Sequence, residues 1–199
     1  MFIIYLRCFV DCGAIVSPSN KFRVTSECPN SACVGATYKW VLERFDTESW
    51  ETLSNVADIT ATPINASNFI IKQNMLLSNT QYRLKLSVTS LMKVEGYGLL
   101  EFETAGEPHG GLCKSLVTEG VSLETEFMFE CADWTDRSTP LTYEFRNGDD
   151  PISYGISPVS QKTVLPAGDP ENNSKITINV VIKNAVGVKV VYSFKIKVR

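Results

Sequence analysis

Gly110-Gly111-Leu112-Cys113, continued through Phe129-Glu130-Cys131-Ala132-Asp133-Trp134, is the stretch on which the fold prediction depends. From Val121 to Cys131 one set of alternate residues is mostly apolar, whereas the other set is mostly polar or acidic. A period of two predicts a half-buried β-strand. The side chain of Cys131 is therefore expected to point inward, close to the ring of Trp134.

A disulfide between Cys113 and Cys131 follows from this pattern. Both residues lie near the ends of consecutive strands, where antiparallel pairing brings Cα atoms within the about 4.4–6.8 Å that a disulfide requires. The ring of Trp134 is expected to cover the bond. Two free buried thiols are the alternative, since free cysteine is a common core residue.

Length and charge limit the class of protein. The chain has 199 residues and a net charge of -3. That length permits one large domain or two small ones, and the acidic balance argues against nucleic acid as a partner. No apolar run reaches the about 20 residues of a membrane-spanning helix. Arg7 interrupts the first apolar run, so residues 2–10 are expected to form a strand rather than a signal peptide, and Met1 to be a gene-model start or a cloning residue.

Six cysteines and two glycosylation sequons predict an oxidising, extracellular environment. Asn65-Ala66-Ser67 and Asn172-Asn173-Ser174 make Asn65 and Asn172 candidate glycosylation sites. The remaining four cysteines stand in the first half of the chain, at Cys8, Cys12, Cys28 and Cys33.

The pairing of these four cysteines is left open between two schemes. By analogy with the second half of the chain, Cys8–Cys28 with Cys12–Cys33 is favoured, and Cys12–Cys28 with Cys8–Cys33 is the alternative. A structural zinc site is disfavoured, because the spacers of three and four residues are toward the upper end of the usual two to four and no second-site histidine is available.

The sequence predicts an all-β fold with two tandem antiparallel β-sandwich domains, residues 1–106 and 107–199. Glycine and proline cluster without periodicity from Ala105 to Gly111, as is typical of a domain junction. Beyond it the pattern begins again, since Tyr143-Glu144-Phe145 repeats Tyr38-Lys39-Trp40 at an offset of about one small sandwich, roughly 100 residues. The short connections favour antiparallel sheets.

Aromatic residues mark the expected cores. Alternation from Tyr82 to Val88 predicts a strand, and its position after Leu76 and a turn predicts a tyrosine corner, in which the hydroxyl bonds to upstream backbone. Trp40 and Trp134 are expected to be buried. Trp50 stands among acidic residues and is expected to be more exposed.

No catalytic constellation is present in the sequence. His109 is the only histidine and lies in the predicted linker, and no glycine-rich loop joins a strand to a helix. Asp133, Asp136, Asp149 and Asp150 are interpreted as turn residues rather than as calcium ligands. The sequence therefore predicts no enzyme, no cofactor and no metal site.

Taken in order, these motifs resemble the receptor-for-egg-jelly (REJ) module of the polycystin-1 family. The resemblance rests on Gly110-Gly111-x-Cys113, Asp133-Trp134-x-Asp136, Pro140-Leu141-x-Tyr143, Leu6-Arg7-Cys8-x-x-x-Cys12, Cys28-x-x-x-x-Cys33, Tyr38-x-Trp40 and Leu165-Pro166-Ala167-Gly168.

The resemblance implies tandem fibronectin-III/Ig-like domains on the extracellular side of the plasma membrane, as part of a multi-pass membrane receptor. It also implies neighbouring ectodomains and a polycystin-2-type cation channel as partners, and some members respond to egg-coat glycans. The alternative is a secreted or cell-surface adhesion or carbohydrate-binding module that is not attached to a polycystin.

One face is a candidate for an anionic glycan. Lys195, Lys197 and Arg199 alternate with apolar residues in the final strand, so the three cations are expected to project together into solvent. The alternative is a charged edge strand that prevents aggregation.

Overall fold

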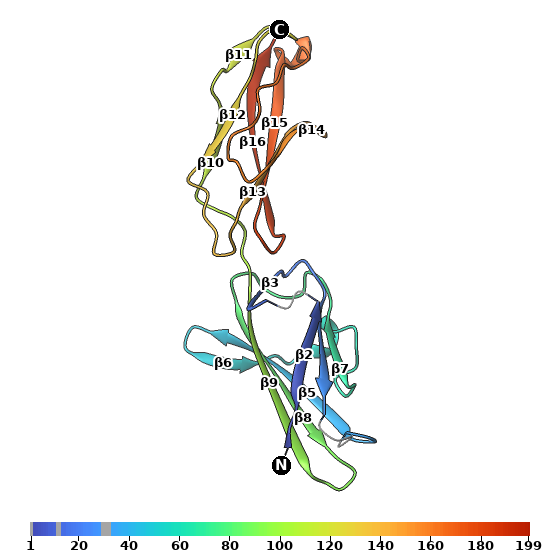
Figure 1. The fold of residues 1–199 in the computed structure, drawn as a ribbon. Coiled ribbons are helices and arrows are strands. Elements are labelled where there is room, and N and C mark those ends of the chain that lie inside the picture. Colours follow the sequence, from blue (N-terminus) through green and yellow to red (C-terminus); the bar gives the residue numbers. More distant parts are fainter. Residues whose placement is uncertain (1, 11–12, 29–32) are drawn as a thin grey trace. The chain divides into compact units, whose positions relative to one another are not determined.

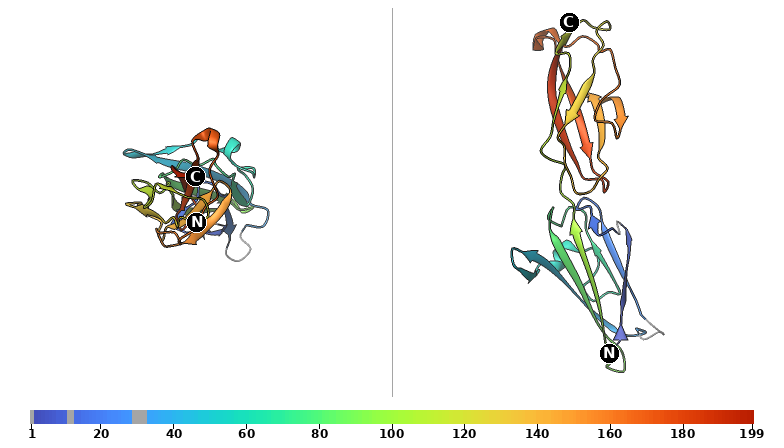
Figure 2. Two further views of the ribbon diagram at one scale, coloured as in Figure 1. Left: turned by 90° about the horizontal axis from the view of Figure 1, so that it is seen from above. Right: turned by 60° about the vertical axis from the view of Figure 1, so that its left-hand side comes forward.

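The computed structural model describes residues 2–10, 13–28 and 33–199 and divides the chain into two units, Met1–Gly106 and Glu107–Arg199. The division lies inside the segment rich in glycine and proline where the sequence places a boundary. Apart from short helical turns, the described elements are β-strands (Figure 1). Figure 2 shows the strands of each unit from two further directions.

The first unit packs two sheets against one core. The smaller sheet consists of β2 (Tyr5–Val10), β4 (Phe22–Glu27) and β7 (Asn68–Ile71). The larger sheet has the order β1 (Phe2–Ile3), β9 (Glu95–Thr104), β8 (Gln81–Thr89), β5 (Thr37–Asp46) and β6 (Ser49–Thr52), with β3 (Ile15–Val16) also on β9. A short helix, α1 (Val56–Ile59), lies between β6 and β7.

The predicted first strand is in fact two strands in different sheets. β1 pairs with β9 in the larger sheet, whereas β2 pairs with β4 in the smaller one. Ile4 lies between them and is 3% exposed, so the chain crosses from one sheet to the other through the core. The long ladders are antiparallel as expected, but β1 and β3 run parallel to β9.

The core of the first unit contains the predicted aromatic residues. The Trp40 side chain is 2% exposed, stacks near Phe69 and donates its Nε1 hydrogen to the Ala66 carbonyl at 2.8 Å. The Tyr82 hydroxyl accepts the backbone N–H of Leu77 at 2.9 Å, which confirms the tyrosine corner.

The second unit also has two sheets. β10 (Leu112–Ser115) pairs with β12 (Phe129–Ala132). The five-stranded sheet has the order β11 (Glu119–Gly120), β16 (Lys189–Val198), β15 (Lys175–Lys183), β13 (Thr142–Asn147) and β14 (Asp150–Gly155), and a 3-10 helix, η2 (Pro170–Asn172), precedes β15. β11 runs parallel to β16, unlike the other pairs of this sheet.

The Cys113–Cys131 disulfide is present. The two Cα atoms lie 4.0 Å apart, slightly below the expected range, because the residues face each other directly in the β10–β12 ladder. Trp134 is only half-buried, so its predicted full burial is wrong. Its ring lies against Gly111, where a Cβ atom would overlap it, and meets Tyr192 edge-on at 5.9 Å.

The predicted strand from Val121 to Cys131 is wrong over its first half. Leu123 has a φ of 59° and is 69% exposed, and Thr125 donates its backbone N–H to the Val121 carbonyl at 3.0 Å. The Thr125 hydroxyl also accepts the Val121 N–H at 2.8 Å. These local bonds form a turn, so the regular strand begins only at Phe129.

Both pairing schemes for the first four cysteines are wrong. Cys28 is bonded to Cys33 with their Cα atoms 5.9 Å apart, whereas each scheme assigns these two residues to different partners. The two cysteines are only five residues apart in sequence, so the bond is local, whereas both schemes predicted bonds between more distant cysteines. Cys8 is also disulfide-bonded, and Cys12 lies outside the described residues.

Candidate functional site

The candidate site is the outward face of the five-stranded sheet in the second unit. Alternate residues of β15 enter the core, including Ile178, Val180 and Ile182, which are completely buried. The residues between them must therefore face solvent. Their partners on β16 face the same way, which gives the outward pairs Lys175–Lys197, Thr177–Lys195, Asn179–Ser193, Val181–Val191 and Lys183–Lys189.

The three predicted glycan-binding cations do not share one environment. Lys195 and Lys197 lie on this outward face. Arg199 follows the strand and forms an ion pair with Glu119, with 3.5 Å between Nη2 and Oε2. β11 pairs with β16 only at Lys197 and Val198, so the rest of β16 has no strand partner on that side, and the alternative of a charged edge strand stays open for Lys195.

Positive charge extends beyond the final strand. Lys183 and Lys189 face each other at the opposite end of the same ladder, and Arg146 lies on the neighbouring strand β13. Lys183 and Lys175 are eight residues apart, which corresponds to about 26 Å along a strand. A basic face of this length contrasts with the net charge of -3 for the whole chain.

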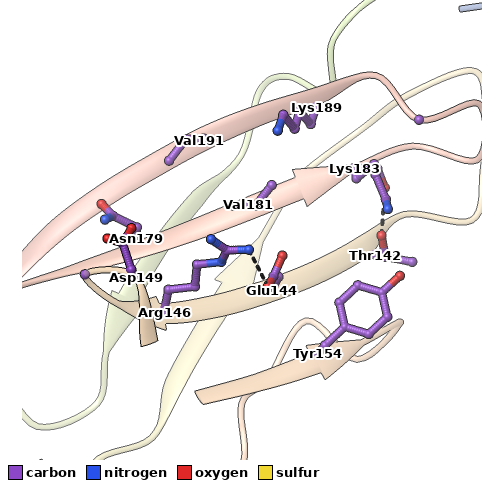
Figure 3. Close-up of a pocket in the computed structure, with 12 residues that line it drawn as sticks. Thr142, Glu144, Arg146, Asp149, Tyr154, Asn179, Val181, Lys183, Lys189 and Val191 are labelled. Atoms are coloured by element: carbon purple, nitrogen blue, oxygen red, sulfur yellow. Dashed lines mark hydrogen bonds and ion pairs between the residues drawn. The ribbon is translucent and has the colours of Figure 1, made fainter. Parts of the chain in front are cut away.

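A hollow of about 460 Å³ opens on this face (Figure 3). This volume falls within the range of about 300–1,000 Å³ that is usual for small-ligand sites. The residues that line it come from four strands and two turns: Thr142, Glu144, Arg146, Gly148, Asp149, Tyr154, Asn179, Val181, Lys183, Gly187, Lys189 and Val191.

The edge strand β14 forms one wall of the hollow. Asn147 and Asp150 close a two-residue turn, in which Gly148 has a φ of 59° that few other residues adopt. A register shift opposite Pro151 then bends the strand. Tyr154 follows, opposite Glu144, and is 64% exposed.

Charges within the hollow are only partly compensated. Arg146 Nη2 donates to Glu144 Oε1 at 2.7 Å. Lys183 Nζ lies 5.9 Å from the centre of the Tyr154 ring, which is a cation–π contact. Among the residues that the structure describes, neither Lys183 nor Lys189 forms an ion pair with a carboxylate.

Polar groups that recognise hydroxyls lie beside these cations. Asn179 Oδ1 accepts a hydrogen bond from Ser193 Oγ at 2.8 Å, and the Asn179 amide nitrogen remains at the hollow. Thr142 Oγ1 donates to the Lys183 carbonyl at 3.3 Å (Figure 3). The arrangement therefore combines three cations, two carboxylates, an amide and an exposed aromatic ring.

The two sequon asparagines are exposed. Asn65 lies in a turn of the first unit, and Asn172 ends η2 in the second. The carbonyl of Ser174, two residues after Asn172, accepts the N–H of Val198 at 2.9 Å. Asn172 therefore lies near the end of the basic face formed by Lys175 and Lys197.

Other candidates for chemistry are dispersed. His109 is exposed and its Nδ1 lies 3.2 Å from the Glu107 carbonyl oxygen. Asp136 Oδ1 accepts the N–H of Ser138 at 2.6 Å, as a turn residue does. Within residues 2–10, 13–28 and 33–199, no three potential metal-ligating side chains form a group.

The sequence interpretation missed most of the hollow. Tyr154, Arg146 and Asn179 come together through the pairing of β13, β14 and β15. The alternation of Lys175, Thr177, Asn179 and Lys183 with buried residues was the available signal for one outward strand. No sequence pattern within β15 indicated which strands lie beside it in the sheet.

Comparison with known proteins identifies a family. The REJ domain family model matches residues 1–199. No curated relative matches the chain in sequence. No helix among the described residues is long and apolar enough to cross a membrane.

Solved structures with a similar fold include tandem modules. The fibronectin(III)-like modules of CbhA from Clostridium thermocellum share 9% identity, with 98% of this chain and 95% of that chain covered and a TM-score of 0.46. Murine CEACAM1b shares 10% identity over 98% of each chain at a TM-score of 0.39. A two-domain fibronectin type III segment of chicken tenascin shares 12% identity over 97% of each chain at 0.36.

Proposed function

The chain belongs to the REJ domain family, and on that basis we propose that it is a non-catalytic extracellular fragment of a polycystin-1-like multi-pass membrane receptor. The observation that carries the proposal is the family match over all 199 residues. REJ domains are extracellular modules with no known catalytic role. The Cys28–Cys33 and Cys113–Cys131 disulfides agree with an oxidising environment.

In this proposal the fragment is a structural and ligand-binding part of the ectodomain, on the extracellular side of the plasma membrane. Its partners are neighbouring ectodomains of the same receptor and, through the full-length protein, a polycystin-2-type cation-channel subunit. Ligand engagement at the ectodomain would then be linked to channel signalling.

The full-length transcript tests the receptor assignment. A polycystin-1-like receptor requires a proteolysis domain and a series of membrane helices downstream in the same reading frame. An intact transcript that ends without any membrane helix would exclude it. Surface labelling of unpermeabilised cells with an antibody against the fragment provides an independent test of the extracellular location.

A carbohydrate-binding adhesion module is the second candidate, and the basic face favours it specifically. Lys195 and Lys197 at one end, with Lys183 and Lys189 at the other, provide a surface for an anionic glycan. The fragment is expected to be retained on a sulfated polysaccharide column at low salt and to elute as salt rises. Passage of the wild-type fragment without retention would remove this candidate.

A further inference from the structure

We propose that the hollow beside Tyr154 is a binding subsite for one acidic sugar unit, with the sugar ring on Tyr154 and its sulfate or carboxylate at Lys183 and Lys189. This proposal rests on the glycan-binding form of the proposed function. It goes beyond that function by assigning the main ligand contacts to Lys183 and Lys189, at the opposite end of the sheet from Lys195 and Lys197.

The cationic part of the subsite is the facing pair Lys183 and Lys189. Their register places them directly opposite each other on β15 and β16, and neither is paired with a carboxylate among the described residues. An oxyanion that reaches both side chains would gain charge-assisted hydrogen bonds from two ammonium groups. Of the two acidic residues that line the hollow, Glu144 and Asp149, Glu144 is already bonded to Arg146.

The apolar part of the subsite lies in the next row of the sheet. Val181 faces Val191, which is 54% exposed, and Glu144 separates this floor from Tyr154. The exposed ring of Tyr154 fits the C–H face of a sugar ring, and the two valines form a separate apolar patch on the other side of Glu144. A purely ionic polymer would gain little from either feature.

The polar part of the subsite favours a hydroxylated ligand. Glu144 offers carboxylate oxygens that accept hydrogen bonds from hydroxyls, and Asn179 offers an amide. A carboxylate inside a basic hollow repels a uniformly anionic polymer. A sugar can place its anionic group at the lysines and its hydroxyls at Glu144. The combination of cations and a carboxylate in one hollow therefore indicates an acidic saccharide.

The test compares four variants of the 199-residue fragment on three immobilised probes. Lys183→Glu with Lys189→Glu alters the hollow, Lys195→Glu with Lys197→Glu is the matched charge change outside it, and Tyr154→Ala removes the ring. The probes are a sulfated polysaccharide, a polysaccharide whose only anions are carboxylates, and polyphosphate, which has no sugar. Melting temperatures verify folding, and Tyr154→Phe keeps the ring if Tyr154→Ala fails to fold.

The hollow variant is expected to bind the polysaccharides about tenfold more weakly, with a smaller loss for its matched control. Tyr154→Ala is expected to weaken binding to the polysaccharides and to leave polyphosphate binding unchanged, whereas Tyr154→Phe behaves as wild type. Retention on one polysaccharide or both identifies sulfate or carboxylate as the recognised anion, and either result agrees with the subsite.

Three outcomes would overturn the subsite. If the Lys195 and Lys197 variant alone loses binding, the hollow is not the site, although the glycan-binding function stands. If Tyr154→Ala weakens all three probes equally, or none of them, the sugar ring does not lie on Tyr154. If wild type binds no polysaccharide, both the subsite and the glycan-binding function are wrong.

Discussion

The outward faces of the two larger sheets use similar residues with opposite results. In the first unit Glu43 on β5 lies opposite Arg83 on β8, and it bonds Arg83 at 2.5 Å and Lys85 at 2.7 Å. In the second unit Glu144 on β13 lies opposite Val181 and bonds Arg146 of its own strand. One central carboxylate thus neutralises two cations in the first unit and only one in the second.

An aromatic side chain adds to this contrast. In the first unit the guanidinium of Arg83 lies 4.3 Å from the centre of the Trp50 ring, so its charge is engaged on two sides. In the second unit Tyr154 stands at the sheet edge and is mostly exposed. The register of one acidic residue therefore decides whether a basic sheet face stabilises its own fold or remains open to an anionic ligand.

The largest expected effect is a loss of stability when the core of the first unit is altered. Trp40→Ala is expected to lower the free energy of unfolding by about 3–5 kcal/mol, because it empties a fully packed aromatic site and removes the bond to Ala66. Trp134→Ala is expected to cost less, since Trp134 is half-buried. Urea unfolding of the two variants measures both, and wild-type behaviour of the Trp40 variant would contradict the core assignment.

Removing one disulfide from each unit compares how much each bond contributes to stability. Replacing Cys113 and Cys131 by alanine opens a loop closed over 18 residues and is expected to cost about 3 kcal/mol. Replacing Cys28 and Cys33 opens a loop of five and is expected to cost about 2 kcal/mol. Equal losses in chemical unfolding would show that chain entropy does not explain these bonds.

Acid is expected to destabilise the first unit through Glu43. Burial by itself raises the pKa of Glu43, but the hydrogen bonds and charges of Lys85 and Arg83 outweigh burial and hold the pKa below its usual value. A carboxyl with a lowered folded-state pKa stabilises the fold above its unfolded pKa of about 4.3, and this stabilisation is lost as pH falls through the folded pKa.

Glu43→Gln tests this effect. The variant is expected to lose about 1–3 kcal/mol near neutral pH, because Arg83 and Lys85 lose their charged partner, and to show a flatter decline below pH of about 4.3. Glu144→Gln is the matched control and is expected to lose less stability near neutral pH, since Glu144 is less buried than Glu43 and has one cationic partner instead of two. Parallel pH profiles for wild type and Glu43→Gln would exclude Glu43 as the titrating group.

The sequence predicted features that depend on local patterns. Alternation identified β8, the Tyr82 corner and the burial of Trp40, because each residue's neighbours in sequence determine which side it faces. Cys113–Cys131 was predictable because both residues end consecutive strands. Alternation failed from Val121 to Thr125, since a turn closed by a threonine side chain has the same polarity pattern as a strand.

The candidate site was less predictable because it depends on pairings between distant residues. Arg199 forms an ion pair with Glu119, which is 80 residues earlier in the chain and which no local pattern pointed to. Tyr154 reaches the hollow only through the pairing of β14 with β13, and Lys183 reaches Tyr154 through β15. No single strand contains a signal for such a site, because the sheet order determines which residues share it.

The smallest expected effect concerns glycosylation. A glycan on Asn172 would emerge beside Lys175 and Lys197, because the Ser174 carbonyl bonds the N–H of Val198 at 2.9 Å. It would hinder an anionic polysaccharide at that end of the basic face while leaving the hollow open. Asn172→Gln, made in secretory cells, is therefore expected to elute from a sulfated polysaccharide at higher salt than wild type, with an affinity gain below about tenfold.

Asn65→Gln is the matched control, because it removes the other sequon from the first unit, where Arg83 and Lys85 are already bonded to Glu43. It is expected to leave elution unchanged, and intact mass verifies that each site was occupied in the wild-type fragment. A shift of equal size in both variants would show that the glycans act through bulk or charge alone. A shift confined to Asn172→Gln would mean that the glycan covers one end of the basic face, next to the short connection between η2 and β15.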